Sequence, residues 1–261
     1  MLQIRNVSKF FPGVTALDNI SLDFAPGEVH AIVGENGAGK STLIKIICGI
    51  YTPDEGAVLL DGDQMHLRSY KDALDHKINL VSQEIQVIPK STVAENIMLD
   101  KLERYAERSA IDWKKLNRDA AHYMDMVGLA LPSTTVVGAL SAAQKQLIMI
   151  ARSLSSNARI LIMDEPTSAL TRHETENLLQ LLTRIKADGV TIIFVSHKLE
   201  EVLEVADKVS VLRDGSLIGT RPAAGLTKPD IVRMMIGRDA RTSSLGTLTG
   251  RGEPVLDDWT A

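Results

Sequence analysis

Gly34-Glu35-Asn36-Gly37-Ala38-Gly39-Lys40-Ser41 is the stretch of sequence that decides the fold. It matches the pattern G-x-x-x-x-G-K-[ST], whose glycines let the backbone turn tightly and point its N–H groups at phosphate oxygens. The apolar run 29–33 before it predicts a buried strand, and residues 41–47 after it predict a helix. The stretch therefore predicts a phosphate site at a helix N-terminus, with Lys40 near the β- and γ-phosphates and Ser41 at Mg²⁺.

Apolar runs and helical patterns alternate along most of the chain. We expect an α/β fold: a P-loop NTPase core with a mostly parallel sheet, an N-terminal antiparallel β subdomain and an inserted α-helical subdomain at about 85–157. Strands are predicted at 2–8, 16–22, 29–33, 57–60, 78–81, 160–163 and 191–195. Helices are predicted at 41–47 and 142–154, and from the Thr171/Glu174 capping box to Gly189.

The composition excludes several classes of protein. The chain has 261 residues, 44% of them hydrophobic, which is enough to bury a sizeable core. Its net charge of −4 does not suggest a basic surface for nucleic acid, although that net charge is compatible with a local basic patch. Its single cysteine, Cys48, leaves no internal disulfide and fits a reducing compartment. Residues 1–11 predict a strand instead of a signal peptide, and no apolar run approaches the ~20 residues of a membrane-spanning helix. Work at a membrane would therefore need a partner.

Polar side chains follow three of the predicted strands. A carboxylate after a buried strand faces the ligand crevice of a parallel sheet, so Asp164 is predicted to hold the Mg²⁺ water shell and Glu165 to orient or deprotonate the attacking water. His197 can donate to a γ-phosphate oxygen, and Gln83 can reach Mg²⁺ or water. Taken alone, His197 would more often be a structural histidine and Gln83 a solvated turn residue, and neither would be singled out without the family resemblance described next.

These motifs together resemble the ABC transporter ATPases across residues 1 to about 237. The phosphate loop, Gln83, the stretch Leu140-Ser141-Ala142-Ala143-Gln144, residues 160–165 and Val195-Ser196-His197 follow one another in the family's order. The Leu-Ser-x-x-Gln stretch separates this family from other phosphate-loop ATPases. The resemblance implies ATP and Mg²⁺ as cofactors, Phe11 stacked on adenine, and a helical subdomain that docks on a membrane permease.

Two departures from the family pattern narrow the resemblance. Ala142 and Ala143 stand where two glycines are usual, and Thr171 stands where an aspartate is usual. Both resemble the first half of the two-cassette ATPases of monosaccharide importers, as do residues 11–14 and 234–238. We therefore expect a cassette at 1–237, a linker at 238–252 and the start of a second cassette at 253–261.

The resemblance also implies partners. Family cassettes pack head to tail, so Ser141 and Gln144 would contact the nucleotide held by a partner cassette. The implied function is an ATP-binding and ATP-hydrolysing subunit, peripheral at the cytoplasmic face of the inner membrane, that energises import of a monosaccharide or related polyol. Its partners would be a second cassette, transmembrane permease subunits and, indirectly, a periplasmic or extracellular sugar-binding protein, with no nucleic acid.

Two other functions compete with this one. Soluble ABC-type ATPases acting on DNA or ribosomes carry long coiled coils, zinc-binding cysteines or a basic arm, none of which the sequence contains. A non-catalytic nucleotide sensor would not need Lys40, Asp164, Glu165 and His197 together. The expected nucleotide contacts are Phe11, Gly34, Glu35, Asn36, Gly37, Ala38, Gly39, Lys40, Ser41, Thr42, Ser141 and Gln144; the Mg²⁺ contacts are Ser41, Gln83 and Asp164; the catalytic residues are Glu165, His197 and Gln83.

Overall fold

A six-stranded sheet forms the centre of the protein. The structure, a computed structural model, describes residues 1–107 and 110–237. The strands lie in the order β12-β11-β3-β10-β9-β6, and all are parallel except β12. Their bounds are β3 (Val29–Val33), β6 (Ile78–Val81), β9 (Ile160–Asp164), β10 (Thr191–Val195), β11 (Lys208–Arg213) and β12 (Ser216–Pro222). This confirms the mostly parallel sheet.

A smaller antiparallel sheet is built from the N-terminal part of the chain. Its order is β2-β1-β4-β5, with β1 (Leu2–Phe11), β2 (Val14–Phe24), β4 (Glu55–Leu60) and β5 (Asp63–Gln64). Pro12-Gly13 joins β1 to β2, and Gly13 has the positive φ of 78° that a tight turn requires.

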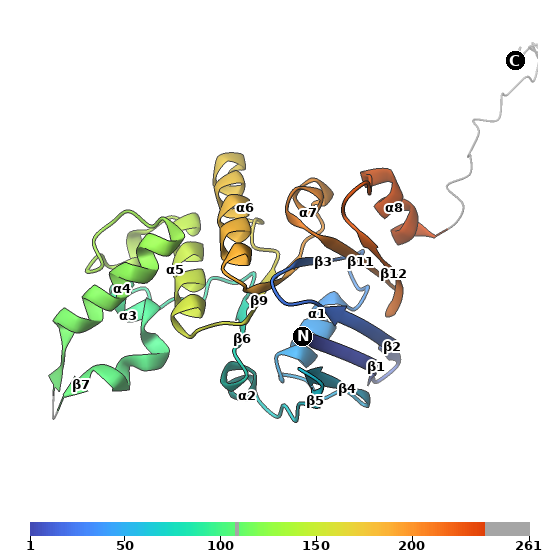
Figure 1. Cartoon of the computed structure of the whole chain (residues 1–261), viewed down its shortest axis with the longest axis horizontal. Coiled ribbons are helices and arrows are strands. Elements are labelled where there is room, and N and C mark those ends of the chain that lie inside the picture. The colour runs from blue at the N-terminus through green and yellow to red at the C-terminus, as the bar shows by residue number, and fades with distance from the viewer. Residues whose placement is uncertain (108–109, 238–261) are drawn as a thin grey trace, which may run out of the picture.

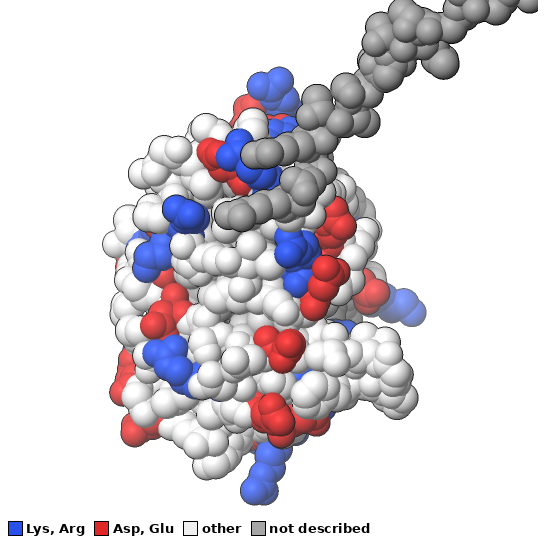
Figure 2. All heavy atoms as spheres, turned by 90° about the vertical axis from the view of Figure 1, so that its right-hand side faces the viewer, with Lys and Arg blue, Asp and Glu red and all other residues white. Residues whose placement is uncertain are grey.

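Basic and acidic side chains are interspersed on the face of the molecule that Figure 2 shows.

The helices fall into two groups (Figure 1). Those around the central sheet are α1 (Lys40–Ile47), α2 (Tyr70–Asp75), α6 (Arg172–Ala187), α7 (Leu199–Val205) and α8 (Lys228–Ile236). The others form a helical lobe of α3 (Val93–Ile97), η1 (Leu99–Tyr105), α4 (Trp113–Val127), η2 (Val137–Ala139) and α5 (Ala142–Ser155). The lobe also contains the short pair β7 (Ala106–Glu107) and β8 (Ala110–Ile111), which the helical expectation for 85–157 did not include. Strands this short give no alternation pattern.

Successive residues of the central strands enter two different cores. In β3, Ala31 and Val33 face the core shared with α5, α6 and α7, whereas Ile32 faces the core shared with α1, β1 and β2. Side chains of a strand alternate between faces, and both faces of this sheet are covered. The strands therefore read as unbroken apolar runs, and the buried Cys48 belongs to the second core.

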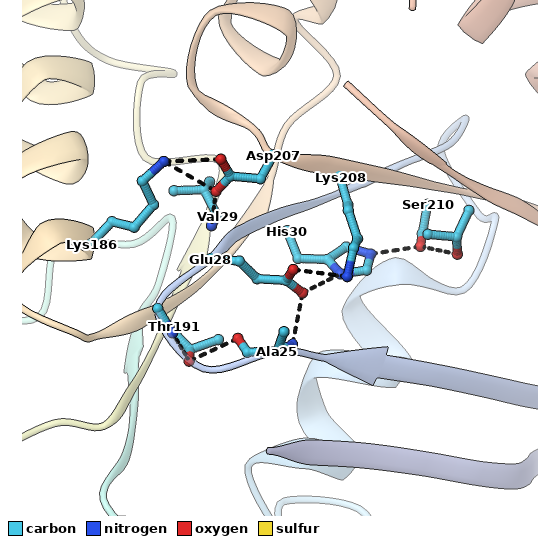
Figure 3. A network of polar contacts seen from close by, with 11 residues as sticks. Ala25, Glu28, Val29, His30, Lys186, Thr191, Asp207, Lys208 and Ser210 are labelled. Atoms are coloured by element: carbon cyan, nitrogen blue, oxygen red, sulfur yellow. Dashed lines mark hydrogen bonds and ion pairs between the residues drawn. The ribbon is translucent and has the colours of Figure 1, made fainter. Parts of the chain in front are cut away.

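A polar network fastens the amino ends of β3 and β11 (Figure 3). Glu28 accepts from the N–H of Ala25 at 2.7 Å, lies 3.2 Å from Nδ1 of His30 and 2.9 Å from Nζ of Lys208. Nε2 of His30 lies 2.7 Å from the Ser210 hydroxyl. Burial raises the pKa of Glu28, but the bonds from His30, Ala25 and Lys208 outweigh burial and hold it at about 2.

The predicted linker 238–252 and the segment 253–261 lie outside the described residues. Among the described helices, none combines the length and the apolar character needed to cross a bilayer.

Candidate nucleotide-binding site

The register of the parallel strands brings the predicted site residues to one edge of the sheet. Val195 of β10 pairs with Ile32 of β3 and with Asp164 of β9, and Met163 pairs with Val81 of β6. Four strands therefore end at nearly the same level. The loop 34–39, Glu165, Ser196-His197 and Ser82-Gln83 all leave the sheet at its carboxyl edge, where ligands bind in α/β folds.

The loop from Gly34 to Gly39 has the backbone of a phosphate cradle. Gly37 and Gly39 have φ values of 86° and 101°, which favour glycine. A Cβ at Gly34 would lie 2.4 Å from the Leu212 carbonyl oxygen, so this position has no room for a side chain. Gly39 is the N-cap of α1, and within the described chain no side chain caps that helix. Its first N–H groups are therefore available to an anion.

The turn between β11 and β12 supports this loop from behind. The N–H of Gly215 donates to the carbonyl of Ala38 at 3.3 Å, and the N–H of Asp18 donates to the carbonyl of Gly215 at 2.8 Å. The turn thereby ties the loop to β2. Asp214-Gly215 is a turn signal in the sequence, but no pattern in the sequence indicates that this turn contacts the loop 34–39.

Lys40 lies over the loop with only 8% of its surface exposed. Its Nζ donates to the carbonyl oxygens of Gly34 at 2.8 Å and Glu35 at 3.0 Å. Burial lowers the pKa of Lys40, and the negative charges of Glu165 and Asp164 oppose that shift. The ammonium is thus held beside the two carboxylates, where it can exchange carbonyl acceptors for phosphate oxygens.

Asp164 and Glu165 put an excess of acidic charge at the end of β9. Burial and the charge of Glu165 raise the pKa of Asp164, while Lys40 opposes the rise. A divalent cation at this place would relieve that repulsion. No cluster of three potential metal-binding acids, histidines or cysteines occurs in the described chain. A magnesium ion here would therefore depend on phosphate oxygens besides Asp164, Ser41 and Gln83, as Mg²⁺ commonly does at nucleotide sites.

Glu165 and His197 come together across the loops that follow β9 and β10. Nδ1 of His197 lies 2.8 Å from Oε2 of Glu165. No donor in the described residues meets hydrogen-bond geometry with this buried oxygen, so we regard the contact as a close approach and not as an aligned bond. Glu165 is 14% exposed in its side chain and His197 61%. The N–H of Glu165 donates to the Val195 carbonyl at 2.9 Å.

Phe11 ends β1 at the β1–β2 turn, with 37% of its surface exposed. Its ring packs edge-on against Tyr51 with centroids 5.5 Å apart, and Lys9 Nζ lies 5.5 Å from its centroid. Tyr51 fixes one edge of the ring. Stacking of Phe11 on adenine stays a prediction.

Ser141 and Gln144 lie elsewhere, at the start of α5 in the helical lobe (Figure 1). The N–H of Gln144 donates to the Ser141 hydroxyl at 3.2 Å, and the N–H of Ser141 donates to Oε1 of Gln144 at 3.0 Å. This reciprocal pair is a capping box. The structure therefore does not bring Ser141 and Gln144 to the loop at Gly34, and their side chains cap α5.

Comparison with known proteins decides the family. The sequence model described as ABC transporter matches residues 17–168. The chain belongs to the ABC transporter family. A ribose import ATP-binding protein, RbsA, of Rhodopirellula baltica is 44% identical over 98% of this chain and 50% of its own length. A putative ribose/galactose/methyl galactoside import ATP-binding protein of Burkholderia ambifaria is 48% identical over 91% of this chain and 46% of its own length. The chain thus spans about half the length of these curated relatives.

Solved structures of ABC cassettes share the fold. The ADP conformation of MJ1267, an ATP-binding cassette of an ABC transporter, superposes with a TM-score of 0.80 at 26% identity, covering 91% of this chain and 98% of that one. The dimeric MJ0796, a bacterial ABC transporter cassette, gives a TM-score of 0.74 at 29% identity, covering 87% and 100%. An ABC cassette with a parallel core and a helical lobe is therefore the fold of this chain.

Proposed function

We propose that this chain is the ATP-binding and ATP-hydrolysing cassette of an importer for a monosaccharide or related polyol. The observation that carries the proposal is the shared carboxyl edge, where the loop 34–41, Asp164, Glu165 and His197 converge. The names of the relatives support the transport role and the sugar class. We further propose that the cassette spans residues 1–237, that 238–252 is a linker and that 253–261 starts a second cassette.

Nucleotide binding would rest on the loop and on Lys40. Backbone N–H groups of residues 34–42 would bind phosphate oxygens, and Phe11 would stack on the adenine. Lys40 would release the Gly34 and Glu35 carbonyls and bind the β- and γ-phosphates. Magnesium, held by Ser41, Asp164 and Gln83, would supply positive charge that neutralises the phosphates.

Hydrolysis would rest on Glu165 and His197. The carboxylate of Glu165 accepts a proton from the attacking water or orients that water. Because Nδ1 of His197 faces Glu165, Nε2 is the ring nitrogen left to meet a γ-phosphate oxygen, and it donates when it carries the proton.

A second cassette would complete the site. Ser141 and Gln144 lie at the start of α5 in the helical lobe, and we expect them to contact a nucleotide held by a partner cassette. The methyl groups of Ala142 and Ala143 would limit close approach of that nucleotide to the backbone of α5. The site formed by the loop 34–41 would then be the more competent of the two.

Co-purification tests the transport role. We expect the chain to bind the cytoplasmic face of the membrane. The tagged chain is therefore isolated from membranes solubilised in detergent. We expect permease subunits to copurify, and the external sugar-binding protein to raise ATP hydrolysis by that complex. Recovery with ribosomes or nucleic acid instead would favour the soluble DNA- or ribosome-acting class, which no observation above supports.

A further inference from the structure

A polar cluster joins the loop after β9 to the loop after β10, and none of its members was predicted as a site residue. The Thr167 hydroxyl donates to Oε2 of Glu201 at 2.6 Å. The Lys198 ammonium donates to the Thr167 carbonyl at 3.0 Å and lies 3.1 Å from Oε1 of Glu201. We call these three residues the Lys198 latch.

The latch is largely shielded from water. Thr167 is fully buried, and the side chains of Glu201 and Lys198 are 11% and 35% exposed. An ion pair in this position is screened less by salt than a surface pair. Removing Lys198 or Thr167 would leave the largely buried Glu201 carboxylate with one partner fewer, which is costly.

Each end of the latch is next to one of the two residues assigned to hydrolysis. Lys198 directly follows His197, and its N–H donates to the Ser196 hydroxyl at 3.0 Å. Only Pro166 separates Thr167 from Glu165, and its ring fixes the backbone φ at that position. The latch therefore fixes the two loops to each other within two residues of the pair.

The backbone of Glu165 is held by its bond to the Val195 carbonyl, but the side chain of His197 has little to hold it. The His197 side chain is mostly exposed, and its approach to Glu165 is not an aligned hydrogen bond. From these contacts we infer that the Lys198 latch sets the position of His197 relative to Glu165. Lys198, Thr167 and Glu201 are then positioning residues for ATP hydrolysis, an inference that rests on the proposed function.

The test compares ATP hydrolysis with ATP binding in the full chain. Lys198→Met, Thr167→Val and Glu201→Gln are each expected to lower kcat by about 10- to 100-fold, the scale of a misplaced catalytic group, while the Kd for a fluorescent ATP analogue stays within about twofold. Lys198→Arg and Thr167→Ser keep the donors and are expected to recover most of the kcat.

An ion pair between α7 and α8 provides the control. Lys228 contacts Glu200, the neighbour of Glu201 on α7, but that pair is exposed. Lys228→Met and Glu200→Gln are expected to leave kcat unchanged. If the latch variants lower kcat no more than these controls, the inference is wrong.

A double variant separates positioning from general stability. In a His197→Ala background, Lys198→Met should lower kcat no further, because the residue that it positions is gone. A full additional loss would overturn the inference. Glu165→Gln reports on the proposed function separately: if it and the wild type both fail to hydrolyse ATP at every chain concentration, the proposed function fails and the inference falls with it. If only Glu165→Gln fails, the function stands whatever the latch variants do.

Discussion

At the scale of single residues, Glu165 adopts a backbone conformation that side chains seldom take. Its φ is 48°, although it is not glycine. This conformation costs energy and persists only where the surrounding structure enforces it, and residues that adopt it are frequent at functional sites. Here the bond from its N–H to Val195 provides that support.

Replacing Glu165 by Gln tests its assignment as general base. The amide keeps the size of the side chain but cannot take a proton from water, so kcat should fall by about 10²- to 10⁴-fold. Binding of ATP should be largely unchanged, since it rests on the loop and Lys40. Steady-state hydrolysis and a fluorescent-nucleotide titration measure the two effects, and wild-type turnover by Glu165→Gln would exclude the assignment.

Lys40 should show the opposite pattern. Lys40→Ala removes the cation that the loop holds between Gly34 and Glu35, so ATP affinity should fall by about 10- to 100-fold, the worth of a charge-assisted hydrogen bond. The same titration applied to Lys114→Ala, an exposed lysine of α4, is the control. Equal affinities for both variants would contradict a phosphate role for Lys40.

At the scale of elements, the Glu28 network makes the join between β3 and β11 sensitive to acid. The pKa of Glu28 falls from 4.5 to about 2 in the folded chain. A carboxyl group whose pKa is lower in the folded than in the unfolded chain stabilises the fold at a pH above its unfolded pKa. Glu28 should therefore add roughly 2–4 kcal/mol to the free energy of unfolding above pH 4.5, and this contribution should be lost as the pH falls towards 2. Urea unfolding of Glu28→Gln should show a deficit that shrinks over this window. Glu204→Gln, on the surface of α7, should show no such pH-dependent deficit.

The sequence predicted the bounds of a strand correctly where the strand is a continuous apolar run. Strands β3, β6 and β10 have the predicted bounds, because both faces are buried and the apolar runs are continuous. The prediction assigned no element after His197, although β11, α7, β12 and α8 lie there.

The candidate site was likewise predictable only in part. The loop 34–41 and the acids of β9 have motifs, and strand register then accounts for their meeting at one edge. The Lys198 latch and the support of Ala38 by Gly215 depend on which loops lie side by side. Tertiary contacts of that kind leave no periodicity in the sequence.

At the scale of the whole molecule, the loop 34–41 lies beside the central sheet, whereas the Ser141/Gln144 capping box lies in the helical lobe. Alone, the chain should bind ATP but hydrolyse it slowly, and the specific rate should rise with chain concentration if two copies must meet. Measuring turnover across a wide range of concentrations checks this. Fast turnover that does not depend on concentration would show that one copy is sufficient.

The carboxyl ends of four strands, β3, β10, β9 and β6, lie at nearly the same level. This alignment limits where the sequence can accept insertions and deletions. One inserted residue in any of these strands would advance its loop by about 3.3 Å and turn its side chains to the opposite face. Loops at the amino edge outside the Glu28 network are under no such restriction and can vary in length. Insertions and deletions accepted by this cassette should therefore fall at the amino edge and in the helical lobe, while the lengths of these four strands stay fixed.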